Sequence, residues 1–173
     1  MDKHIYIKRK ALSKDQCKFL INFFEKQKSE PNKRGYDGLY VSLHQSELNF
    51  VGNILSKYIK EYAEKHKFLK IVISWDLRAD FHLQRYLPGN SYSGEHMEHG
   101  INEVDSIRLL GWMIYLNNIK NKGGTCWPQQ NFTSKPREGD LYIWPAGWTH
   151  SHYGVPTPNE MKYIATGWCA MHR

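Results

Sequence analysis

Apolar positions in the first 70 residues recur with the period of amphipathic helices. A short strand candidate at residues 5–7 is followed by Ser13, a residue type that favours helix N-caps. The apolar residues after it follow the i, i+3, i+4, i+7 pattern: Cys17, Leu20, Ile21 and Phe24. This pattern predicts a helix that ends near Pro31. A second apolar stripe predicts a helix from about Ser46 to His66, with Leu48, Val51, Leu55, Tyr58 and Tyr62 on one face.

From residue 71 onward the chain changes to short runs rich in β-branched and aromatic residues. These runs predict strands at residues 71–75, 81–86, 107–116, 141–144 and 163–168. Turn residues separate them, including Pro88, Gly89 and Asn90. Two helices followed by many short strands predict a mainly β (α+β) fold, a jelly roll with the helices packed on one sheet.

Length and composition agree with one domain. At 173 residues and 40% hydrophobic residues, the chain can bury one core but would leave two cores marginal. We expect a single domain over residues 1–173, in which residues 1–70 form a helical support region and residues 71–173 form the jelly-roll core. We further expect a monomer or a small homo-oligomer.

Cysteine usage and the N-terminus bear on location. The three cysteines have no CxxC spacing, so they predict reduced thiols rather than a disulfide framework or a thiolate zinc site. The first ten residues are too charged for a signal peptide, and no segment reaches the roughly 20 apolar residues of a membrane span. The prediction is a soluble cytoplasmic protein, in the host cytoplasm if the source is viral.

The net charge of +7 lies in the first part of the chain. Up to Asn90 there are 17 Lys and Arg against 10 Asp and Glu, and after it 7 against 7. A basic region can attract nucleic acid or an acidic peptide. Its lysines are spaced along the predicted helices without clustered arginines and aromatics, which indicates solvated helix faces. A nucleic-acid partner therefore stays open but is not favoured.

One candidate for metal chemistry is the pair His96 and Glu98. If this segment is a strand, residues two apart share a face, so both side chains point into one cavity while Met97 and His99 point away. Alone this pair is a weak signal, because nine histidines give several such spacings by chance. A later segment, residues 144–156, supplies further histidines at the end of another predicted strand.

Two histidines and one carboxylate would hold iron(II) and leave three adjacent coordination positions open. Zinc hydrolases use similar ligands, so the metal depends on another residue. That residue is Lys162, which shares a strand face with Thr166 and Trp168. A lysine on an inward apolar face requires a negative charge nearby, which a dicarboxylate would supply. The alternative is a lysine on the solvent face.

Taken together, residues 81–168 resemble the prolyl 4-hydroxylase branch of the iron(II)/2-oxoglutarate oxygenases, particularly its small bacterial and phage members. The resemblance rests on a tyrosine before a Pro-Gly turn, a His-x-Glu pair about ten residues later, and a histidine ten residues ahead of a lysine. In chain order these are Tyr86 with Pro88 and Gly89, His96 with Glu98, then His152 and Lys162. The segment Tyr115-Leu116-Asn117 matches a further strand of the family.

The resemblance implies a double-stranded β-helix of the cupin type and a role for each matched residue. His96, Glu98 and His152 would bind iron(II), and Lys162 with Tyr115 would bind the far carboxylate of 2-oxoglutarate. Three further side chains would border the cosubstrate: Tyr86, Thr166 and Trp168.

The family's distal histidine has a proline four residues later, and Pro156 fits His152 rather than His150. His150 nevertheless stays an alternative ligand. On a regular strand it would share the face of His152 and either support the ligands or face the substrate. Arg85 and Arg108 could face either the substrate or solvent, and the sequence does not decide between them.

Two departures from the family pattern concern the metal and the substrate. Glu98 stands where most members have Asp, which adds one methylene and keeps the charge. Residues 124–127 match the family's Gly-Gly-Glu-Thr segment only loosely, and that segment borders the active-site mouth.

The resemblance implies an oxygenase that uses Fe(II), 2-oxoglutarate and O2, with ascorbate as a further candidate reductant. It favours hydroxylation of a prolyl residue in a peptide or protein. The alternatives are an oxygenase for another substrate (a free amino acid, another protein side chain or nucleic acid), a zinc hydrolase, and a metal-binding jelly-roll module without catalysis.

Overall fold

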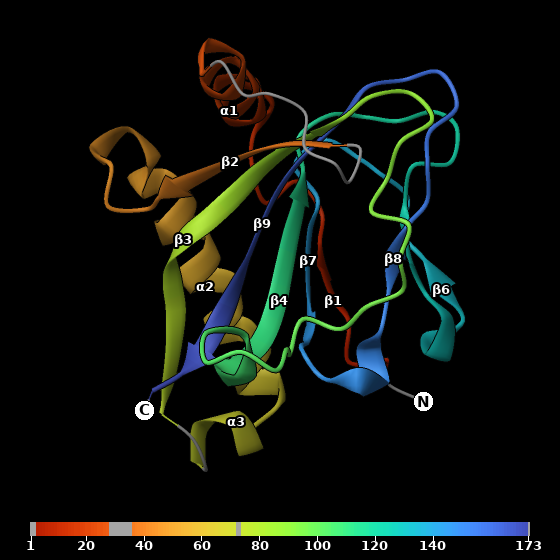
Figure 1. Cartoon of the computed structure of the whole chain (residues 1–173). Coiled ribbons are helices and arrows are strands. Elements are labelled where there is room, and N and C mark those ends of the chain that lie inside the picture. Colours follow the sequence, from red (N-terminus) through yellow and green to blue (C-terminus); the bar gives the residue numbers. More distant parts are fainter. Residues whose placement is uncertain (1–2, 28–35, 72–73, 173) are drawn as a thin grey trace.

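The structure, a computed structural model, describes residues 3–27, 36–71 and 74–172. Two antiparallel sheets form its centre, and the helices cover the larger sheet (Figure 1). The helices are α1 (Lys14–Lys26), α2 (Asn49–Lys65) and α3 (Phe68–Ile71), with 3-10 turns η1 (Ser46–Leu48), η2 (Asp105–Ile107), η3 (Pro128–Gln130) and η4 (Trp148–His150). The strands are β1 (Tyr6–Lys8), β2 (Tyr36–Ser42), β3 (Trp75–Tyr86), β4 (Arg108–Tyr115), β5 (Thr125–Trp127), β6 (Phe132–Thr133), β7 (Leu141–Pro145), β8 (Tyr153–Gly154) and β9 (Lys162–Met171).

The larger sheet has six strands in the order β1-β7-β4-β9-β3-β2, and the smaller has three in the order β6-β5-β8. Every pairing between these strands is antiparallel. Strands adjacent in the larger sheet are far apart in sequence, so the sheet is held together by long-range pairing. This mainly β architecture with helices on one sheet confirms the predicted fold class.

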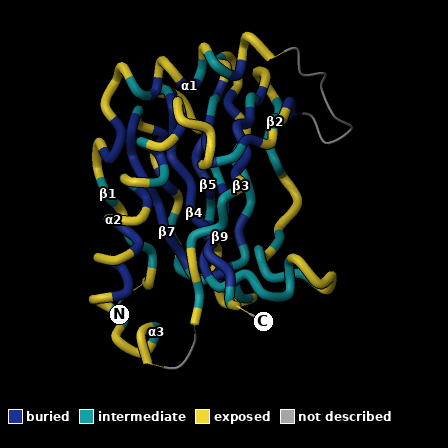
Figure 2. The backbone as a smooth tube through the Cα atoms, turned by 90° about the vertical axis from the view of Figure 1, so that its left-hand side faces the viewer, coloured by how far each residue is buried: buried dark blue, intermediate teal, exposed yellow. Residues whose placement is uncertain are grey.

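Side chains of the larger sheet alternate between two apolar cores. Leu110, Trp112 and Ile114 of β4 face the helices and pack with α1 and α2. Met113 and Tyr115 point the other way, into an aromatic core between the two sheets. Because successive strand residues point to opposite faces, both faces of the sheet are covered. Figure 2 shows the central strands as buried and the outer turns of the helices as exposed.

Helix α1 begins where the sequence predicts. The Ser13 hydroxyl accepts from the Gln16 N–H, and the Gln16 side chain accepts from the Ser13 N–H, which together form a capping box. Leu20 and Phe24 are buried against the sheet. The predicted end near Pro31 is wrong, because Gln27 already has extended backbone angles and closes the helix. Pro31 itself lies outside the described residues.

Two strand predictions are corrected by the structure. Ile71 belongs to the short helix α3 rather than to a strand, and residues 72–73 lie outside the described residues. Strand β3 begins at Trp75 and runs to Tyr86, with a register shift between Leu77 and Phe81. The polar residues at this irregularity interrupted the apolar pattern, so the sequence predicted only the second half of the strand.

Strand β2 was not predicted, and it turns part of the expected helical support region into a sheet edge. It pairs with β3 from Tyr36↔Tyr86 to Ser42↔Asp80. Its apolar pattern is weak because Asp37 is buried, at 1% exposure, and forms an ion pair with Arg85. An edge strand with one buried acidic side chain does not have the alternation that identifies a strand.

No helix among the described residues is long and apolar enough to cross a membrane.

We predict that Gly167→Ala destabilises the protein by about 1–3 kcal/mol, because an overpacked core must shift. A Cβ on Gly167 of β9 would lie 2.6 Å from Cζ2 of the buried Trp112. Urea unfolding would measure the free energy of unfolding. Gly147→Ala is the matched control, since a Cβ there meets nothing within 4 Å. Equal stability of the two variants would contradict this packing.

Candidate metal centre

His96 and His152 are joined through their backbones in an isolated antiparallel bridge. The His96 N–H donates to the His152 carbonyl at 3.0 Å, and the His152 N–H donates to the His96 carbonyl at 2.8 Å. The two imidazole centroids lie 4.4 Å apart. His96 therefore lies in an isolated bridge rather than in a regular strand, but the bridge still places both rings on the same side.

Each histidine has a backbone acceptor at Nδ1. Nδ1 of His96 lies 2.9 Å from the Gly94 carbonyl, and Nδ1 of His152 lies 3.0 Å from the His150 carbonyl. A carbonyl can only accept, so each neutral ring carries its hydrogen on Nδ1 and its lone pair on Nε2. This is the tautomer in which Nε2 binds a metal.

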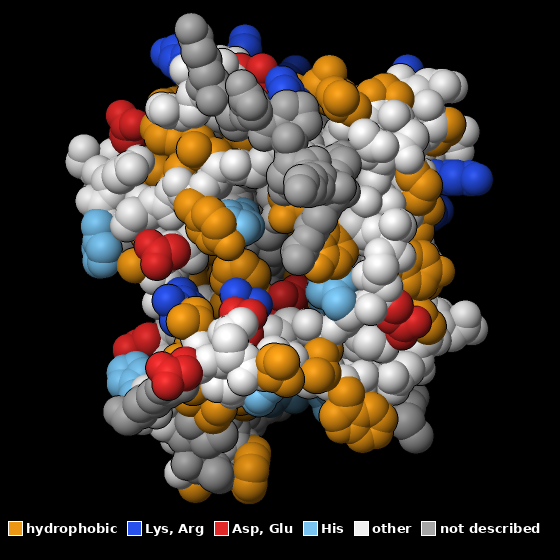
Figure 3. Space-filling view, viewed as in Figure 1, with side chains coloured by type: hydrophobic (Ala, Val, Ile, Leu, Met, Phe, Trp, Pro, Cys, Tyr) orange, Lys and Arg blue, Asp and Glu red, His pale blue; other side chains and the backbone are white. Residues whose placement is uncertain are grey.

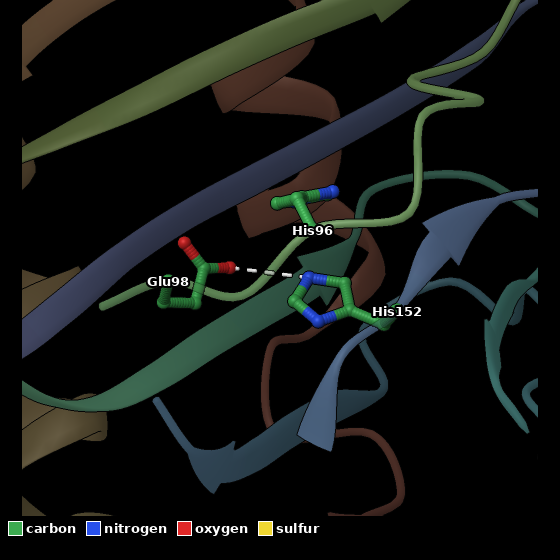
Figure 4. Close-up of side chains that lie close together, drawn as sticks. All are labelled: His96, Glu98 and His152. Atoms are coloured by element: carbon green, nitrogen blue, oxygen red, sulfur yellow. Dashed lines mark ion pairs between the residues drawn. The ribbon is translucent and has the colours of Figure 1, made fainter. Parts of the chain in front are cut away.

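The Glu98 carboxylate points toward the His152 ring (Figure 4). The N–H of Glu98 donates to the Ala146 carbonyl, which ties the segment to the end of β7. Its Oε1 lies 3.2 Å from Nε2 of His152, and its Oε2 accepts from Nε1 of Trp168 at 2.7 Å. One donor atom from each of His96, Glu98 and His152 lies within 4.8 Å of the others.

Gly111 of β4 makes room for this carboxylate. A Cβ at position 111 would lie 2.9 Å from the Trp144 ring and 3.1 Å from Cγ of Glu98. Both distances are shorter than ordinary carbon contacts, so a larger residue would displace the carboxylate or the indole. The additional methylene of Glu98, compared with the Asp of most family members, lies against this glycine.

Burial alone would raise the pKa of Glu98, but the hydrogen bond and charge of His152, the charge of His96 and the hydrogen bond from Trp168 lower it to about 2. The carboxylate is thus ionised at neutral pH. When both imidazoles are neutral, as metal binding requires, they form with the carboxylate a donor set that fits a divalent iron ion and leaves positions open for other ligands.

The cluster lies in the wall of a cavity of about 380 Å³. In the space-filling view, charged and histidine side chains gather in the hollowed centre of this face, with hydrophobic side chains around it (Figure 3). Thr166 and Trp168 of β9 line the cavity, as predicted from their shared strand face. Thr166 donates to the Trp112 carbonyl, and Nε1 of Trp168 donates to the Glu98 carboxylate.

Lys162 is not among the lining residues, but it lies on the same face of β9, two residues before the lining residue Ile164. It is only 3% exposed, and its Nζ donates to the Gly123 carbonyl at 3.0 Å and lies 4.7 Å from the centre of the Tyr86 ring. Burial lowers its pKa to about 8, and no carboxylate of the described residues contributes to that pKa. The alternative of a solvent-facing lysine is therefore wrong.

Tyr86 and Tyr115 also belong to the inner core rather than to the cavity surface. Tyr86 donates to Oε1 of Gln84 at 2.8 Å. The Tyr115 hydroxyl lies 2.7 Å from the Ser134 hydroxyl and 3.2 Å from that of Thr125, which lines the cavity. Burial raises the pKa of both phenols, so they stay protonated and can donate.

His150 does not share the face of His152, so this expectation is corrected. It ends the 3-10 turn η4, and its Nε2 lies 3.0 Å from the Lys3 carbonyl, away from the cluster. The turn rotates its side chain out of the strand alternation. Its backbone carbonyl, however, supports Nδ1 of His152.

Arg85 points away from the cavity, so the structure does not favour the substrate-facing alternative for this residue. It bonds Asp37 and Glu25 and lies over the Phe24 ring, on the helix-covered face of β3. Arg108, by contrast, lines the cavity. It stacks on Trp168 at 3.7 Å, donates to the Glu98 carbonyl at 3.2 Å and pairs with Asp105 at 2.7 Å.

Several residues of the cavity wall were not predicted as site residues from the sequence, among them Tyr40, His82, Gln84 and Trp144. His82 and Gln84 lie two residues apart and two residues before Tyr86, so strand alternation carried back from Tyr86 would have found them. Tyr40 belongs to the strand that was not predicted.

A double-stranded β-helix whose cavity holds two histidines and one carboxylate has the features of a non-haem iron protein. Residues 81–170 match the family model of the 2OG-Fe(II) oxygenase superfamily. The chain belongs to this superfamily, whose description names 2-oxoglutarate and Fe(II).

A protein of Acanthamoeba polyphaga mimivirus, named as a candidate prolyl 4-hydroxylase, is 31% identical over an alignment that covers 56% of this chain and 46% of that relative. The chain thus spans about half the length of this curated relative.

Solved structures share the fold across nearly the whole chain. The viral collagen prolyl hydroxylase of Paramecium bursaria Chlorella virus-1, in its 2-oxoglutarate complex, has a TM-score of 0.79 at 22% identity and covers 96% of each chain. A prolyl 4-hydroxylase of Pseudomonas putida has a TM-score of 0.76 at 16% identity, covering 98% of this chain and 94% of its own. A Trichoplax adhaerens prolyl hydroxylase in complex with a hypoxia-inducible-factor peptide has 0.73 at 16%, covering 96% and 83%.

We predict that Lys162→Met stabilises the ligand-free protein at pH 7, because a buried cation without a carboxylate partner is replaced by an apolar chain of similar length. The lysine's folded pKa of about 8 is below its ordinary value of 10.5. Its burial penalty therefore develops as the pH falls from 10.5 to 8 and is absent above 10.5.

Urea unfolding of both proteins at pH 7, 9 and 10.5 measures this difference. The gain from Lys162→Met should be of order 1–3 kcal/mol at pH 7 and should shrink as the pH rises. A variant that is less stable than the wild type at every pH would contradict the unpaired, buried lysine.

Proposed function

We propose that this protein is an iron(II)- and 2-oxoglutarate-dependent oxygenase that hydroxylates a prolyl residue in a peptide or protein. The observation that carries the proposal is the convergence of His96, Glu98 and His152 at one cavity, with the buried Lys162 on the same face of β9 as the cavity residue Ile164. A metal-binding module would need only the three ligands, whereas a dicarboxylate cosubstrate also accounts for a buried, unpaired cation.

In this proposal Nε2 of His96, Nε2 of His152 and the Glu98 carboxylate hold Fe(II). Lys162 binds the far carboxylate of 2-oxoglutarate through a charge-assisted hydrogen bond, with Tyr115 as a neighbouring phenol donor and the Tyr86 ring beside the ammonium group. Such a contact fixes the orientation of the cosubstrate. When bound, Fe(II) and 2-oxoglutarate supply the activation of O2, with oxidation of 2-oxoglutarate to succinate and CO2 and hydroxylation of a C–H bond.

The protein's own residues orient the ligands and exclude water. Trp168 holds one oxygen of Glu98, so the other faces the histidines. Arg108 stacks on Trp168 at the cavity wall, where it can contact a peptide acceptor. Aromatic side chains around the cluster, including Trp144 and Tyr92, limit the access of water to the metal.

The proposed substrate class rests on relatives. The mimivirus relative is named for prolyl 4-hydroxylation, and the Trichoplax structure holds a peptide. A cavity that opens to the surface beside Arg108 agrees with a substrate that enters as an extended segment. Ascorbate is proposed only as a reductant that maintains Fe(II).

We predict that Fe(II)-loaded protein forms succinate from 2-oxoglutarate and O2, and that proline-rich peptides increase the rate. His152→Ala should abolish turnover because it removes one ligand. Lys162→Met should raise the 2-oxoglutarate Kd by at least tenfold, since a charge-assisted contact is lost. His44→Phe, at an exposed histidine outside the cavity, is the control. Turnover that persists in His152→Ala would refute the ligand assignment, and stimulation by a free amino acid or RNA instead would refute the substrate.

We predict that Trp168→Phe weakens Fe(II) binding about 10-fold to 100-fold, because groups that orient a ligand usually contribute this much to metal affinity. Phe keeps an aromatic ring but cannot donate to Oε2 of Glu98. Trp75→Phe is the matched control, since its indole donates to the Leu69 carbonyl outside the cavity. Anaerobic titration with Fe(II), followed by calorimetry, measures the affinity. Equal affinities for the two variants would show that Trp168 does not orient the ligand.

A further inference from the structure

A hydrogen-bonded row of three side chains runs along β3 from Tyr86 through Gln84 to His82. The ring of Tyr86 lies beside Nζ of Lys162. The Tyr86 hydroxyl donates to Oε1 of Gln84 at 2.8 Å, and the Gln84 amide nitrogen lies 3.3 Å from Nδ1 of His82. Residues 82, 84 and 86 share the inner face of the strand because strand side chains alternate. No role in metal or cosubstrate binding is assigned above to His82 or Gln84.

The row fixes the tautomer of His82. Since Oε1 of Gln84 accepts from Tyr86, its amide nitrogen faces His82 and donates to Nδ1. Burial and the charge of Arg108 lower the pKa of His82 to about 4, so the ring is neutral at physiological pH. A neutral imidazole that accepts at Nδ1 carries its hydrogen on Nε2.

Among the described residues, this Nε2–H has no hydrogen-bond acceptor. His82 is only 8% exposed, and among the described residues no atom accepts from its Nε2. Two other buried donors of the same cavity wall, Nε of Arg108 and Nε1 of Trp144, also lack acceptors. A buried donor without an acceptor costs free energy, so three of them around one cavity indicate a ligand rich in acceptors.

The cosubstrate does not account for the donor at His82. Tyr86 pairs with Lys162 in the sheet, whereas His82 pairs with Thr166, four residues further along β9. Four residues of a strand span about 13 Å, which exceeds the length of a five-carbon dicarboxylate anchored at Lys162. His82 instead lies beside Trp168, with ring centroids 6.0 Å apart, and Trp168 in turn donates to Glu98.

We propose that Nε2 of His82 donates a hydrogen bond to a backbone carbonyl of the bound peptide and so positions the substrate chain. A peptide carries a carbonyl acceptor at every residue, which matches a wall of unpaired donors. The positive charge of Arg108 nearby also favours an oxygen there. Tyr40 packs over the His82 ring from the edge strand β2 and is 68% exposed, so its side chain can turn outward when the peptide binds. This inference rests on the function proposed above.

The test compares His82→Phe and His82→Gln with the wild type. Phe keeps a planar ring without a donor, and Gln keeps an amide N–H near the position of Nε2. We expect His82→Phe to raise the peptide KM and Kd roughly tenfold, with a smaller change in kcat, and His82→Gln to recover most of that loss. His44→Phe is again the control, and 2-oxoglutarate affinity reports whether the inner site is intact.

A peptide series in which single amides are replaced by esters identifies the acceptor. An ester carbonyl is a weaker acceptor than an amide carbonyl, so one ester position should weaken binding to the wild type and have no further effect in His82→Phe. Such coupling in a double-mutant cycle is not expected from a purely structural role of His82.

The outcomes separate the two proposals. If the wild type neither binds nor converts peptides, the proposed function fails and this inference fails with it. If the wild type converts peptides but His82→Phe and His82→Gln both bind them as tightly as the wild type, the oxygenase proposal stands and the role of His82 is refuted. A lowered melting temperature with unchanged peptide Kd would likewise refute it.

Discussion

The paired backbone hydrogen bonds between His96 and His152 determine the geometry of the site. They join a segment before β4 to the segment between β7 and β8, two stretches more than 50 residues apart. Because the bond is between backbones, it brings the two rings together without using their nitrogens. Each Nδ1 then bonds a local carbonyl, and Nε2 of His152 lies 3.2 Å from the Glu98 carboxylate.

The other side chains around the site compensate charges and hydrogen-bond donors that are buried away from water. Glu98 stays ionised in burial because His152 and Trp168 bond its two oxygens, and Gly111 leaves room for its longer side chain. Among the described residues, Nζ of Lys162 contacts the Gly123 carbonyl and the Tyr86 ring, and no carboxylate contributes to its pKa. Such a buried cation destabilises the ligand-free protein, and an anion that pairs with it removes this penalty and so binds favourably.

Much of the fold and site was predictable from local patterns. The capping box of Ser13 and Gln16 and the apolar stripe of α1 are short-range features, and α1 begins where they predict. The fixed spacing from His152 to Lys162 reflects one strand and the loop before it, so a motif could identify it. The first half of β3 was missed because polar residues at its register shift interrupt the apolar pattern, and β2 was missed because its buried residues include polar ones such as Asp37. Their burial depends on partners elsewhere in the chain, such as Arg85 for Asp37.

The sequence by itself determined the family, the fold class and the residue types available for metal and cosubstrate binding. Only the tertiary structure decided which of these side chains meet. It turned His150 and Arg85 away from the cavity and brought Trp168 onto Glu98. It also left Nε2 of His82 unpaired in the cavity wall. The physical reason is that periodicity fixes the face of an element, whereas a hydrogen bond between distant segments depends on how the elements pack.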